Sequence, residues 1–287
     1  MIDTLVSDIY ALFDPKKEHV CNEDNLERFC QDLKQTLRER LSHKPEPEGG
    51  ESVLRFSALG KPDRQLWFDA HPDGSHEEMT AKTYYKFLYG DVIEQLVLFL
   101  AREAGHSVES QQTEINVDGV KGHVDAIIDG VLVDAKSASP YGYQKLVKGT
   151  VFEDDPFGYV AQLSGYADVL TPGKPAAWLA VEKVSGDIAV VDLPLSKIKE
   201  NPPAPRIAHL REVLASPEPP PFCYQPVPDG VKGNMKLPTA CSYCKWKHRC
   251  HPGLRTFLYS NGPRFLTTVV KTPDVLEVTA GASEFPN

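Results

Sequence analysis

Apolar residues near the start of the chain recur at intervals of three and four, the spacing that places side chains on one face of a helix. Leu5, Ile9, Leu12 and Phe13 form a first stripe, and apolar positions within 26–41 form a second. Asn22, or Asn25 a turn later, is placed to cap the exposed backbone N–H groups at the start of the second helix. The sequence therefore predicts two N-terminal helices.

A longer helix is predicted from Ala81 to Ala104, with Gly105 as its C-cap. Glu94 lies in the middle of this apolar helix, where an acid either faces solvent or serves a site. The residues expected on the buried face are Leu88, Val92, Leu96, Phe99 and Leu100.

Two short apolar runs, 124–128 and 131–133, flank an Asp-Gly pair at positions 129–130. Asp-Gly between such runs favours a two-residue hairpin loop, because both central residues of a type I′ turn need positive φ. The loop fixes the pairing register of the two strands, and in that register Asp125 faces Asp134.

The same register places Lys136 on the face of Asp134 and opposes it to His123. Two directly opposed carboxylates repel each other and destabilise a strand pair. A divalent cation that prefers oxygen ligands, Mg²⁺ or Mn²⁺, offsets that repulsion, and Lys136 adds a positive charge beside it. The alternative is an exposed hairpin whose acids point into water.

The rest of the chain alternates predicted strands and helices. Expected in order are a strand over 108–116, a polar loop over 137–150, a helix over 155–170, strands over 176–182 and 187–193, and a helix over 204–215. This order predicts an α/β fold with a mixed central sheet flanked by helices. The stretch 44–50, rich in Pro, Glu and Gly, is a linker by composition.

The composition is that of a globular protein, with 41% hydrophobic and 25% charged residues. No apolar run approaches the about 18 residues of a membrane span, and the N-terminus lacks the pattern of a secretion signal. We therefore expect a soluble cytoplasmic protein with no membrane partner. The net charge of −9 argues against a general nucleic-acid coat protein but is compatible with a local basic groove. Candidate groove residues are Lys232, Lys236, Lys245, Lys247, Arg249, Arg255, Arg264, Lys145 and Lys148.

Most of the cysteines lie late in the chain, at Cys223, Cys241, Cys244 and Cys250. In a cytosolic protein, clustered cysteines indicate metal ligands before disulfides. Residues 216–253 contain few apolar side chains, so we expect a bound metal to supply the folding free energy of this segment.

Four short motifs occur along the chain in a fixed order: Gly90-x-x-x-Glu94, Gly122-His123-x-Asp125, Asp134-x-Lys136 and Gln162-x-x-x-Tyr166. This order resembles the motif series of RecB-like nucleases in the PD-(D/E)xK superfamily, and the resemblance covers residues 53–255. It implies a restriction-endonuclease-like core with N-terminal helices before it and a metal-bound module after it. The domains expected from this reading are a helical segment over 1–45, a nuclease core over 53–215, a cysteine-rich module over 216–255 and a tail over 256–287.

The resemblance also implies roles for individual residues. Asp125 and Asp134 would hold Mg²⁺ or Mn²⁺, Glu94 would support the metal, and Lys136 would orient or activate the attacking water. The residues expected to contact DNA or brace the site are Gln162, Tyr166, His123 and Lys145.

The cysteine triplet at 241–250 resembles that of iron–sulfur nucleases of the CRISPR-associated and AddB types in the same family. Those enzymes take their fourth cysteine from far upstream, but the corresponding stretch here, 59–67, has none. Cys223 is the nearest substitute. The four thiols would hold a 4Fe–4S cluster or Zn²⁺, and His248 and His251 are alternative zinc ligands.

These features together predict a Mg²⁺- or Mn²⁺-dependent deoxyribonuclease. We expect an exonuclease acting on single-stranded DNA or duplex ends in recombination, repair or phage DNA processing. The alternatives are a structure-selective endonuclease of the same fold and a non-catalytic DNA-binding recombination subunit. Further partners allowed by the resemblance are a second copy of the chain or a recombination or replication protein.

Overall fold

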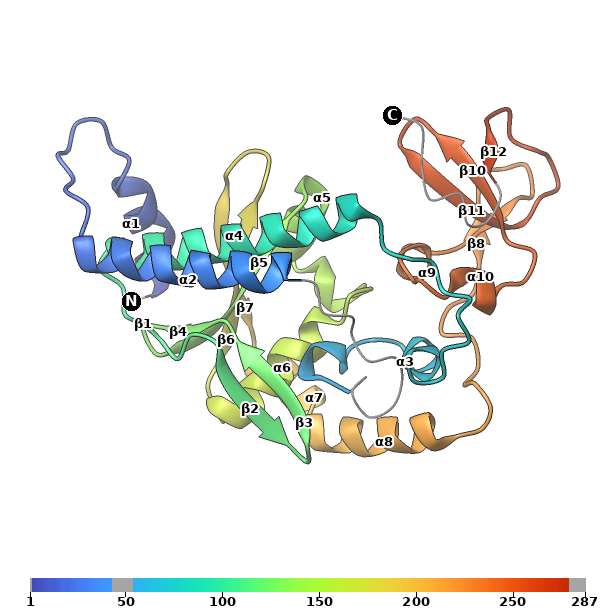
Figure 1. Cartoon of the computed structure of the whole chain (residues 1–287), viewed down its shortest axis with the longest axis horizontal. Helices are drawn as coiled ribbons and strands as arrows, with labels where there is room; N and C mark the ends of the chain where they lie inside the picture. The colour runs from blue at the N-terminus through green and yellow to red at the C-terminus, as the bar shows by residue number, and fades with distance from the viewer. Residues whose placement is uncertain (1, 43–53, 279–287) are drawn as a thin grey trace. The chain divides into compact units, whose positions relative to one another are not determined.

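The computed structural model describes residues 2–42 and 54–278, and these divide into two compact units. Unit 1 comprises residues 2–42, 54–60 and 84–208, and unit 2 comprises 61–83 and 209–278. Figure 1 traces both units along the chain, from blue at the N-terminus to red at the C-terminus. Each unit has a sheet and buried hydrophobic clusters of its own.

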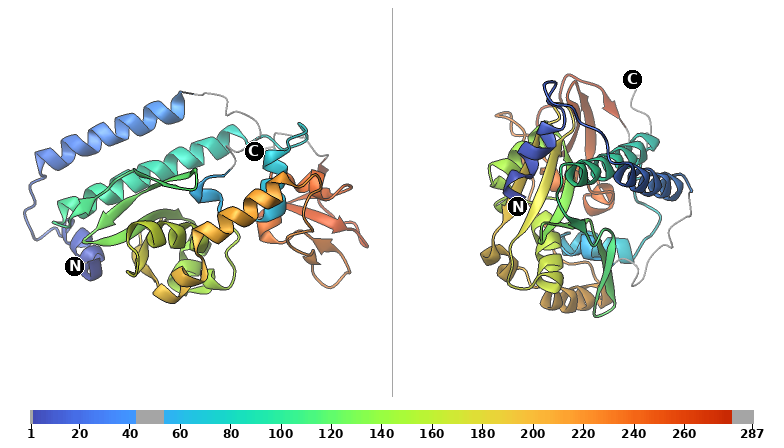
Figure 2. Two further views of the ribbon diagram at one scale, coloured as in Figure 1. Left: turned by 90° about the horizontal axis from the view of Figure 1, so that it is seen from below. Right: turned by 90° about the vertical axis from the view of Figure 1, so that its left-hand side faces the viewer.

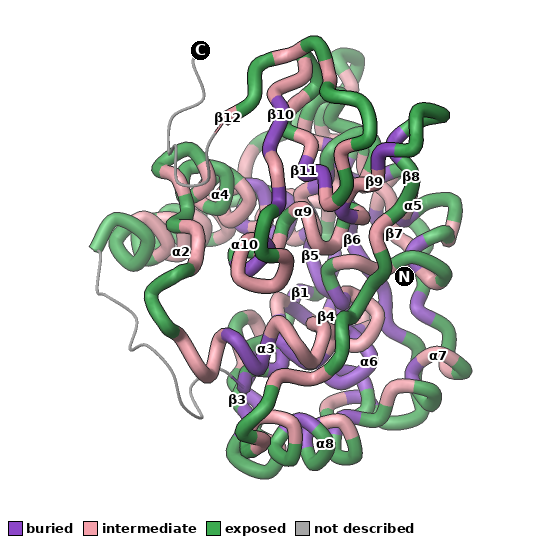
Figure 3. The backbone as a smooth tube through the Cα atoms, turned by 90° about the vertical axis from the view of Figure 1, so that its right-hand side faces the viewer, coloured by how far each residue is buried: buried purple, intermediate pink, exposed green. Residues whose placement is uncertain are grey.

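Unit 1 is built on a five-stranded sheet in the order β1-β4-β5-β6-β7. Its strands are β1 (Val108–Glu109), β4 (Ala126–Ile128), β5 (Val131–Ala138), β6 (Ala176–Glu182) and β7 (Ile188–Leu193). β5 and β6 run parallel, and the other neighbouring pairs are antiparallel. The predicted mixed sheet is therefore confirmed, and its central strands β5 and β6 are largely buried (Figure 3).

Helices cover both faces of this sheet, as the sequence predicts. α1 (Leu5–Ala11) and α4 (Ala81–Glu103) pack on one face, where they share a buried cluster with β4, β5 and β6. Ala135 of β5 belongs to that cluster, so its two neighbours in the strand point to the opposite face. α6 (Tyr159–Leu170) lies on that opposite face, where its side chains meet those of β5.

α2 (Glu23–Leu41) forms a further layer outside α4 (Figure 2). The predicted cap is confirmed, because the Asn22 side chain accepts hydrogen bonds from the backbone N–H groups of Asp24 and Asn25. The rings of Phe29 and Phe99 lie 5.0 Å apart between the two helices.

The predicted bounds of α4 hold, but its predicted buried face is wrong. Leu96 is 42% exposed, and the side chains buried against the sheet are Val97, Leu98 and Ala101; of the predicted residues, Leu100 packs against the same cluster. The helix is apolar on two sides because α2 covers one side and the sheet the other. Apolar periodicity alone does not tell these two sides apart.

The Asp129-Gly130 hairpin has the predicted register, with Ala126 paired to Val133, and both loop residues have positive φ. The predicted single strand over 108–116 is wrong. Positive φ at Ser110 and Gln112 breaks it into β1 and a second strand, β2 (Thr113–Val117).

β2 pairs with β3 (Val120–Val124) as a separate two-stranded sheet. Asp118-Gly119 forms its loop, again with positive φ at both residues. This second Asp-Gly hairpin carries the same sequence signal as the first.

The loop predicted over 137–150 contains α5 (Pro140–Val147). Ser139 caps this helix by accepting a hydrogen bond from the Gly142 N–H, and proline suits the first helical position because it has no N–H to leave unpaired. The remaining short elements of unit 1 are η1 (Ile2–Thr4), η3 (Phe56–Ala58), η4 (Thr150–Phe152) and α7 (Leu195–Glu200). α8 (Pro203–Ala215) follows them in the chain.

Unit 2 joins α3 (Asp63–Ala70) to the C-terminal part of the chain. Its other helices are α9 (Thr239–Ser242) and α10 (Lys247–Cys250). Its strands are β8 (Val227–Pro228), β9 (Met235–Lys236), β10 (Arg255–Tyr259), β11 (Gly262–Thr268) and β12 (Glu277–Val278), in the sheet order β12-β10-β11-β9-β8.

Unit 2 differs from the predicted domains in two ways. Residues 61–83 belong with the cysteine segment rather than with the core, because Trp67 and Phe68 of α3 pack against the buried Trp246. The predicted tail contains β10 and β11, which pair antiparallel. The predicted linker 44–50 lies outside the described residues.

Aromatic packing also contributes to the stability of the cysteine segment in unit 2. Trp246 is almost completely buried, and its Nε1 donates a hydrogen bond to Asp69 Oδ1 at 2.8 Å.

Among the described residues, no helix is long and apolar enough to cross a lipid bilayer.

Candidate functional site

The predicted acids meet at one edge of β5. β4 pairs with residues 131–133 of β5, and the chain just before β4 turns away because β3 pairs with β2. Beyond Val133, a side chain rather than a strand pairs with this edge of β5. Asp125 Oδ2 accepts a hydrogen bond from the Ala135 N–H at 2.7 Å. Asp125 lies between β3 and β4, so the divergence of β3 from the sheet is what creates the site.

Two carboxylates therefore lie close together, and both are partly or fully withdrawn from water. Burial, followed by the charge of Asp134, raises the pKa of Asp125 to about 7. Burial also raises the pKa of Asp134, whose side chain is only 5% exposed. A group that is costly to ionise in this way is stabilised by a nearby cation.

Lys136 supplies one positive charge at this place. Its Nζ lies 2.8 Å from Oδ1 and 2.7 Å from Oδ2 of Asp134. Burial alone would lower the pKa of Lys136, but the charges of Asp134 and Asp125 outweigh burial and raise it. The lysine is therefore protonated at neutral pH.

Glu94 approaches the two aspartates from α4. Gly90, one turn earlier, lies against β5, where an added Cβ would stand 3.1 Å from Ser137 Oγ. Gln112 Nε2 donates a hydrogen bond to Glu94 Oε1 at 3.2 Å. Burial, and then the charges of the two aspartates, raises the pKa of Glu94 to about 9. The structure thus brings the predicted Glu94, the two aspartates and the lysine into one electrostatic group.

α6 closes the other side of the site. Tyr166 stacks on Phe56 with ring centroids 5.3 Å apart, and burial raises its pKa to about 12 even though Gln162 forms a hydrogen bond with it. β3 passes beneath this ring at Gly122, where an added Cβ would lie 2.8 Å from Tyr166 Cε1 and 2.5 Å from Phe56 Cβ. Only glycine fits there.

The sequence interpretation missed Tyr159. Lys136 Nζ lies 5.0 Å from the centroid of its ring, a cation–π distance, and burial raises the pKa of its hydroxyl. The signal was present, because Tyr159 shares a face of α6 with Gln162 and Tyr166 at helical spacing.

Two predicted substrate contacts are paired with other residues in the structure. His123 does not oppose Lys136, because β3 leaves the sheet; it pairs with Glu114 of β2 and is exposed. Lys145 lies on α5, where its Nζ forms an ion pair with Asp154 Oδ2 at 2.5 Å.

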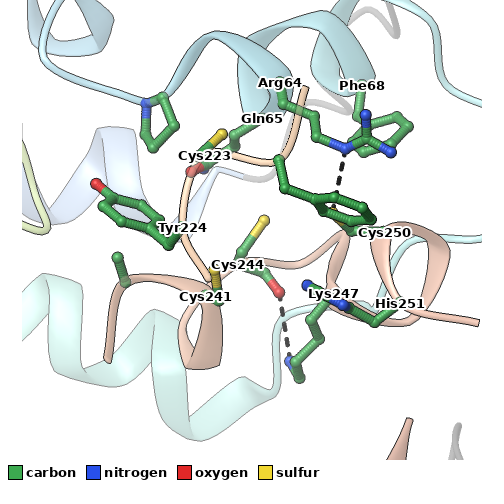
Figure 4. A pocket seen from close by; sticks show the side chains of 13 residues that line it. Arg64, Gln65, Phe68, Cys223, Tyr224, Cys241, Cys244, Lys247, Cys250 and His251 are labelled. Atoms are coloured by element: carbon green, nitrogen blue, oxygen red, sulfur yellow. Dashed lines mark hydrogen bonds between the residues drawn. The ribbon is translucent and has the colours of Figure 1, made fainter. Parts of the chain in front are cut away.

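In unit 2, the structure brings Cys223 and the cysteine triplet together around one cavity of about 30 Å³ (Figure 4). α9 and the turn after it carry Cys241 and Cys244, and Cys250 ends α10. Pro62, from the stretch that lacks the upstream cysteine, also lines this cavity.

Burial and the neighbouring groups shift the pKa values of these cysteines. Burial, and then the charges of the other three thiols, raises the pKa of Cys241 to about 12. Burial raises the pKa of Cys223, while hydrogen bonds from the backbone N–H groups of Arg64 and Gln65 at the start of α3 oppose the rise. Arg64 Nε also donates a hydrogen bond to Cys250 Sγ at 3.2 Å. The two backbone N–H donors favour the thiolate of Cys223, the form that binds metal.

The structure does not support the predicted basic groove over 231–264, because most of these cations are neutralised by acids of unit 2. The ion pairs are Lys236 and Arg264 with Asp229, Lys245 with Asp69, Lys247 with Glu77, Arg249 with Asp73, and Arg255 with Glu277.

Within the described ranges, no group of three or more His, Cys, Asp or Glu side chains is already spaced to hold a metal ion. Donor chemistry nevertheless fits at both places: carboxylate oxygens suit Mg²⁺ or Mn²⁺, and four thiols around one cavity suit Zn²⁺ or an iron–sulfur cluster.

No family model matches the sequence, and no curated protein matches it. Among solved structures, the chain is similar to the crystal structure of SSO0001, with a TM-score of 0.40 and 18% sequence identity. The match covers 77% of this chain and 93% of that one. At this TM-score the likeness assigns neither a family nor a function.

Proposed function

We propose that this protein is a metal-dependent DNA nuclease with a PD-(D/E)xK core in unit 1. One observation carries the proposal: Glu94, Asp125 and Asp134 converge at the open edge of β5. Burial raises the pKa of each of them, and the charges of neighbouring acids add to the rise for Glu94 and Asp125. Such an arrangement is unfavourable without a cation and is common where a divalent ion binds. The order of the four motifs, which resembles that of RecB-like nucleases, supports the same conclusion.

The residues would divide the work of phosphodiester hydrolysis. Asp125 and Asp134 would hold Mg²⁺ or Mn²⁺, and Glu94 would support them. When bound, the ion would supply an activated water and a counter-charge for the phosphate. Lys136, protonated beside Asp134, would stabilise negative charge that develops on the phosphate oxygens.

The chain's own geometry keeps this lysine in place. The Asp134 carboxylate holds Nζ from one side and the Tyr159 ring lies beneath it. Gln162 and Tyr166 brace the site from α6, since Tyr166 fills the space above Gly122.

We propose exonuclease action on single-stranded DNA or duplex ends. A structure-selective endonuclease is the alternative within the same chemistry. Linear and circular single-stranded DNA distinguish the two, because a circle offers no end. A non-catalytic DNA-binding subunit would bind both and cleave neither.

Asp134→Asn and Lys136→Ala test the assignment in the presence of Mn²⁺. We expect each to lower the cleavage rate by about 10²–10³-fold or more while the protein stays folded, as loss of a group that stabilises the transition state does elsewhere. Glu114→Gln and Lys121→Ala are matched controls, because these residues form an exposed ion pair, 2.9 Å long, on the β2–β3 hairpin. Equal rates in all four variants would contradict the proposal.

We also propose that Cys223, Cys241, Cys244 and Cys250 hold a metal centre, either a 4Fe–4S cluster or Zn²⁺. The lining of one cavity by all four sulfurs supports this set, and His251 lines the same cavity as an alternative zinc ligand. The visible absorption spectrum of anaerobically purified protein separates the two, because only the cluster absorbs there.

A further inference from the structure

The N-terminal half of α4 exposes a dense group of aromatic side chains. Tyr84, Tyr85, Phe87 and Tyr89 are all among the exposed large hydrophobic residues. Scattered exposed apolar residues need no explanation, but an exposed apolar patch marks a binding surface. At 100° per residue these four side chains form two such faces, Tyr84 with Phe87 and Tyr85 with Tyr89. Lys86 lies among them and is exposed as well.

Phe87 differs from Tyr85 and Tyr89 in direction. It precedes Glu94 by seven residues, which is two helical turns, so both side chains leave α4 on the same face. Tyr85 lies two residues before Phe87 and therefore leaves the helix on nearly the opposite face. Phe87 is 43% exposed and Tyr85 is 68% exposed.

This face of α4 also carries Glu94, which belongs to the acid group with Asp125 and Asp134. Gly90, between Phe87 and Glu94, lies against Ser137 of β5. Along the helix axis, Phe87 lies about 10 Å from Glu94. Three stacked nucleotides span about the same length, at ~3.4 Å each.

We propose that Phe87 is a base-stacking contact for single-stranded DNA whose phosphate enters the acid group, and that Lys86 contacts the adjoining phosphates. The inference deepens the proposed nuclease function and rests on it. An aromatic face selects unpaired bases because the bases of a duplex are already stacked on one another. With the 231–264 cations paired to acids, stacking also gives an acidic protein a means of holding DNA that does not need a basic groove.

The experiment measures binding without cleavage by fluorescence anisotropy of a labelled oligonucleotide, with Ca²⁺ in place of Mg²⁺ or Mn²⁺ to occupy the carboxylates. The probes are a single strand, the same single strand with an abasic central run, and a blunt duplex. Phe87→Ala should weaken binding of the intact strand by about tenfold, a typical loss for one stacked base. It should leave the abasic strand and the duplex unchanged.

Tyr85→Ala is the matched control, since it removes a more exposed aromatic from the other face of the same helix. It should leave all three affinities unchanged. Lys86→Ala should weaken binding to the intact and abasic strands alike and lower the salt dependence of binding by about one unit of slope.

Three outcomes overturn the inference: equal affinity of Phe87→Ala and the parent protein, equal losses on strand and duplex, or equal losses in Phe87→Ala and Tyr85→Ala. Loss of self-association in Phe87→Ala with unchanged DNA binding would overturn it too, by assigning the face to a second copy of the chain. Cleavage assays keep the two proposals apart. If the parent protein cleaves DNA and Phe87→Ala binds single strands as the parent does, only this inference is refuted. If binding depends on Phe87 but the parent protein does not cleave DNA, only the nuclease proposal is refuted.

Discussion

Asp125→Asn should abolish cleavage and, in metal-free protein, increase stability. In the folded protein Asp125 is held near Asp134, and its pKa is raised from 3.8 to about 7. Asparagine has almost the same shape and carries no charge. Its side-chain oxygen can still accept the hydrogen bond that Asp125 Oδ2 accepts from the Ala135 N–H.

The magnitude follows from linkage between ionisation and folding. Below the unfolded pKa both states are protonated and Asp125 costs nothing. As the pH rises above that value the unfolded state loses its proton first, so stability falls until the pH passes the folded pKa. The full rise corresponds to about 4 kcal/mol. Asp125 is only half-buried, and solvent screens part of this cost, so we expect about 2 kcal/mol above neutral pH.

Scanning calorimetry in EDTA measures the effect. At about pH 8 we expect the transition of unit 1 to rise by about 4–8 °C in Asp125→Asn, and at about pH 4 by much less. Mn²⁺ should stabilise the parent protein above neutral pH and have little effect on the variant. Equal melting temperatures of variant and parent at both pH values would refute the reasoning, as would stabilisation that is independent of pH.

Gly122→Ala should destabilise unit 1 by about 1–3 kcal/mol in urea unfolding, because the new Cβ would stand 2.5 Å from a neighbouring carbon; Gly142→Ala, whose Cβ would have 3.4 Å of room, should not. Tyr159→Leu should lower kcat of cleavage by about tenfold with little change in KM, whereas Tyr159→Phe, which keeps the ring, should retain most of the rate. Cys223→Ser should lower bound metal and the melting temperature of unit 2, while Cys30→Ser, at an exposed position of α2 in unit 1, should change neither. Full metal content in Cys223→Ser would place the fourth ligand elsewhere.

Local features of this protein could be predicted where local chemistry decides the backbone. The Asp129-Gly130 loop sets the register of β4 on β5, because positive φ at both residues permits a two-residue turn. The alternation of side chains along each strand then determines which residues share a face. Asn22 caps α2 for the same local reason. The order of Glu94, Asp125, Asp134 and Lys136 along the chain was likewise readable, and these residues do come together.

Errors of local prediction arose where a signal was present but was outweighed by another pattern. Ser139 and Pro140 start a helix that the polar composition of the segment concealed. Asp118-Gly119 turns the chain between β2 and β3, just after the strand predicted over 108–116, in a stretch to which no element was assigned.

Only the tertiary structure decides which side chains share a space. His123 is not paired opposite Lys136, because β3 pairs with β2 rather than with β5. The register within the Asp129-Gly130 hairpin does not determine which strand β3 pairs with. α4 has two apolar sides, one against α2 and one against the sheet, so periodicity alone does not show which side faces the sheet. Trp67 and Trp246 are far apart in sequence, yet their packing places 61–83 with the cysteines. The contact of Tyr159 with Lys136 is also a tertiary one, because it forms only when α6 packs on β5.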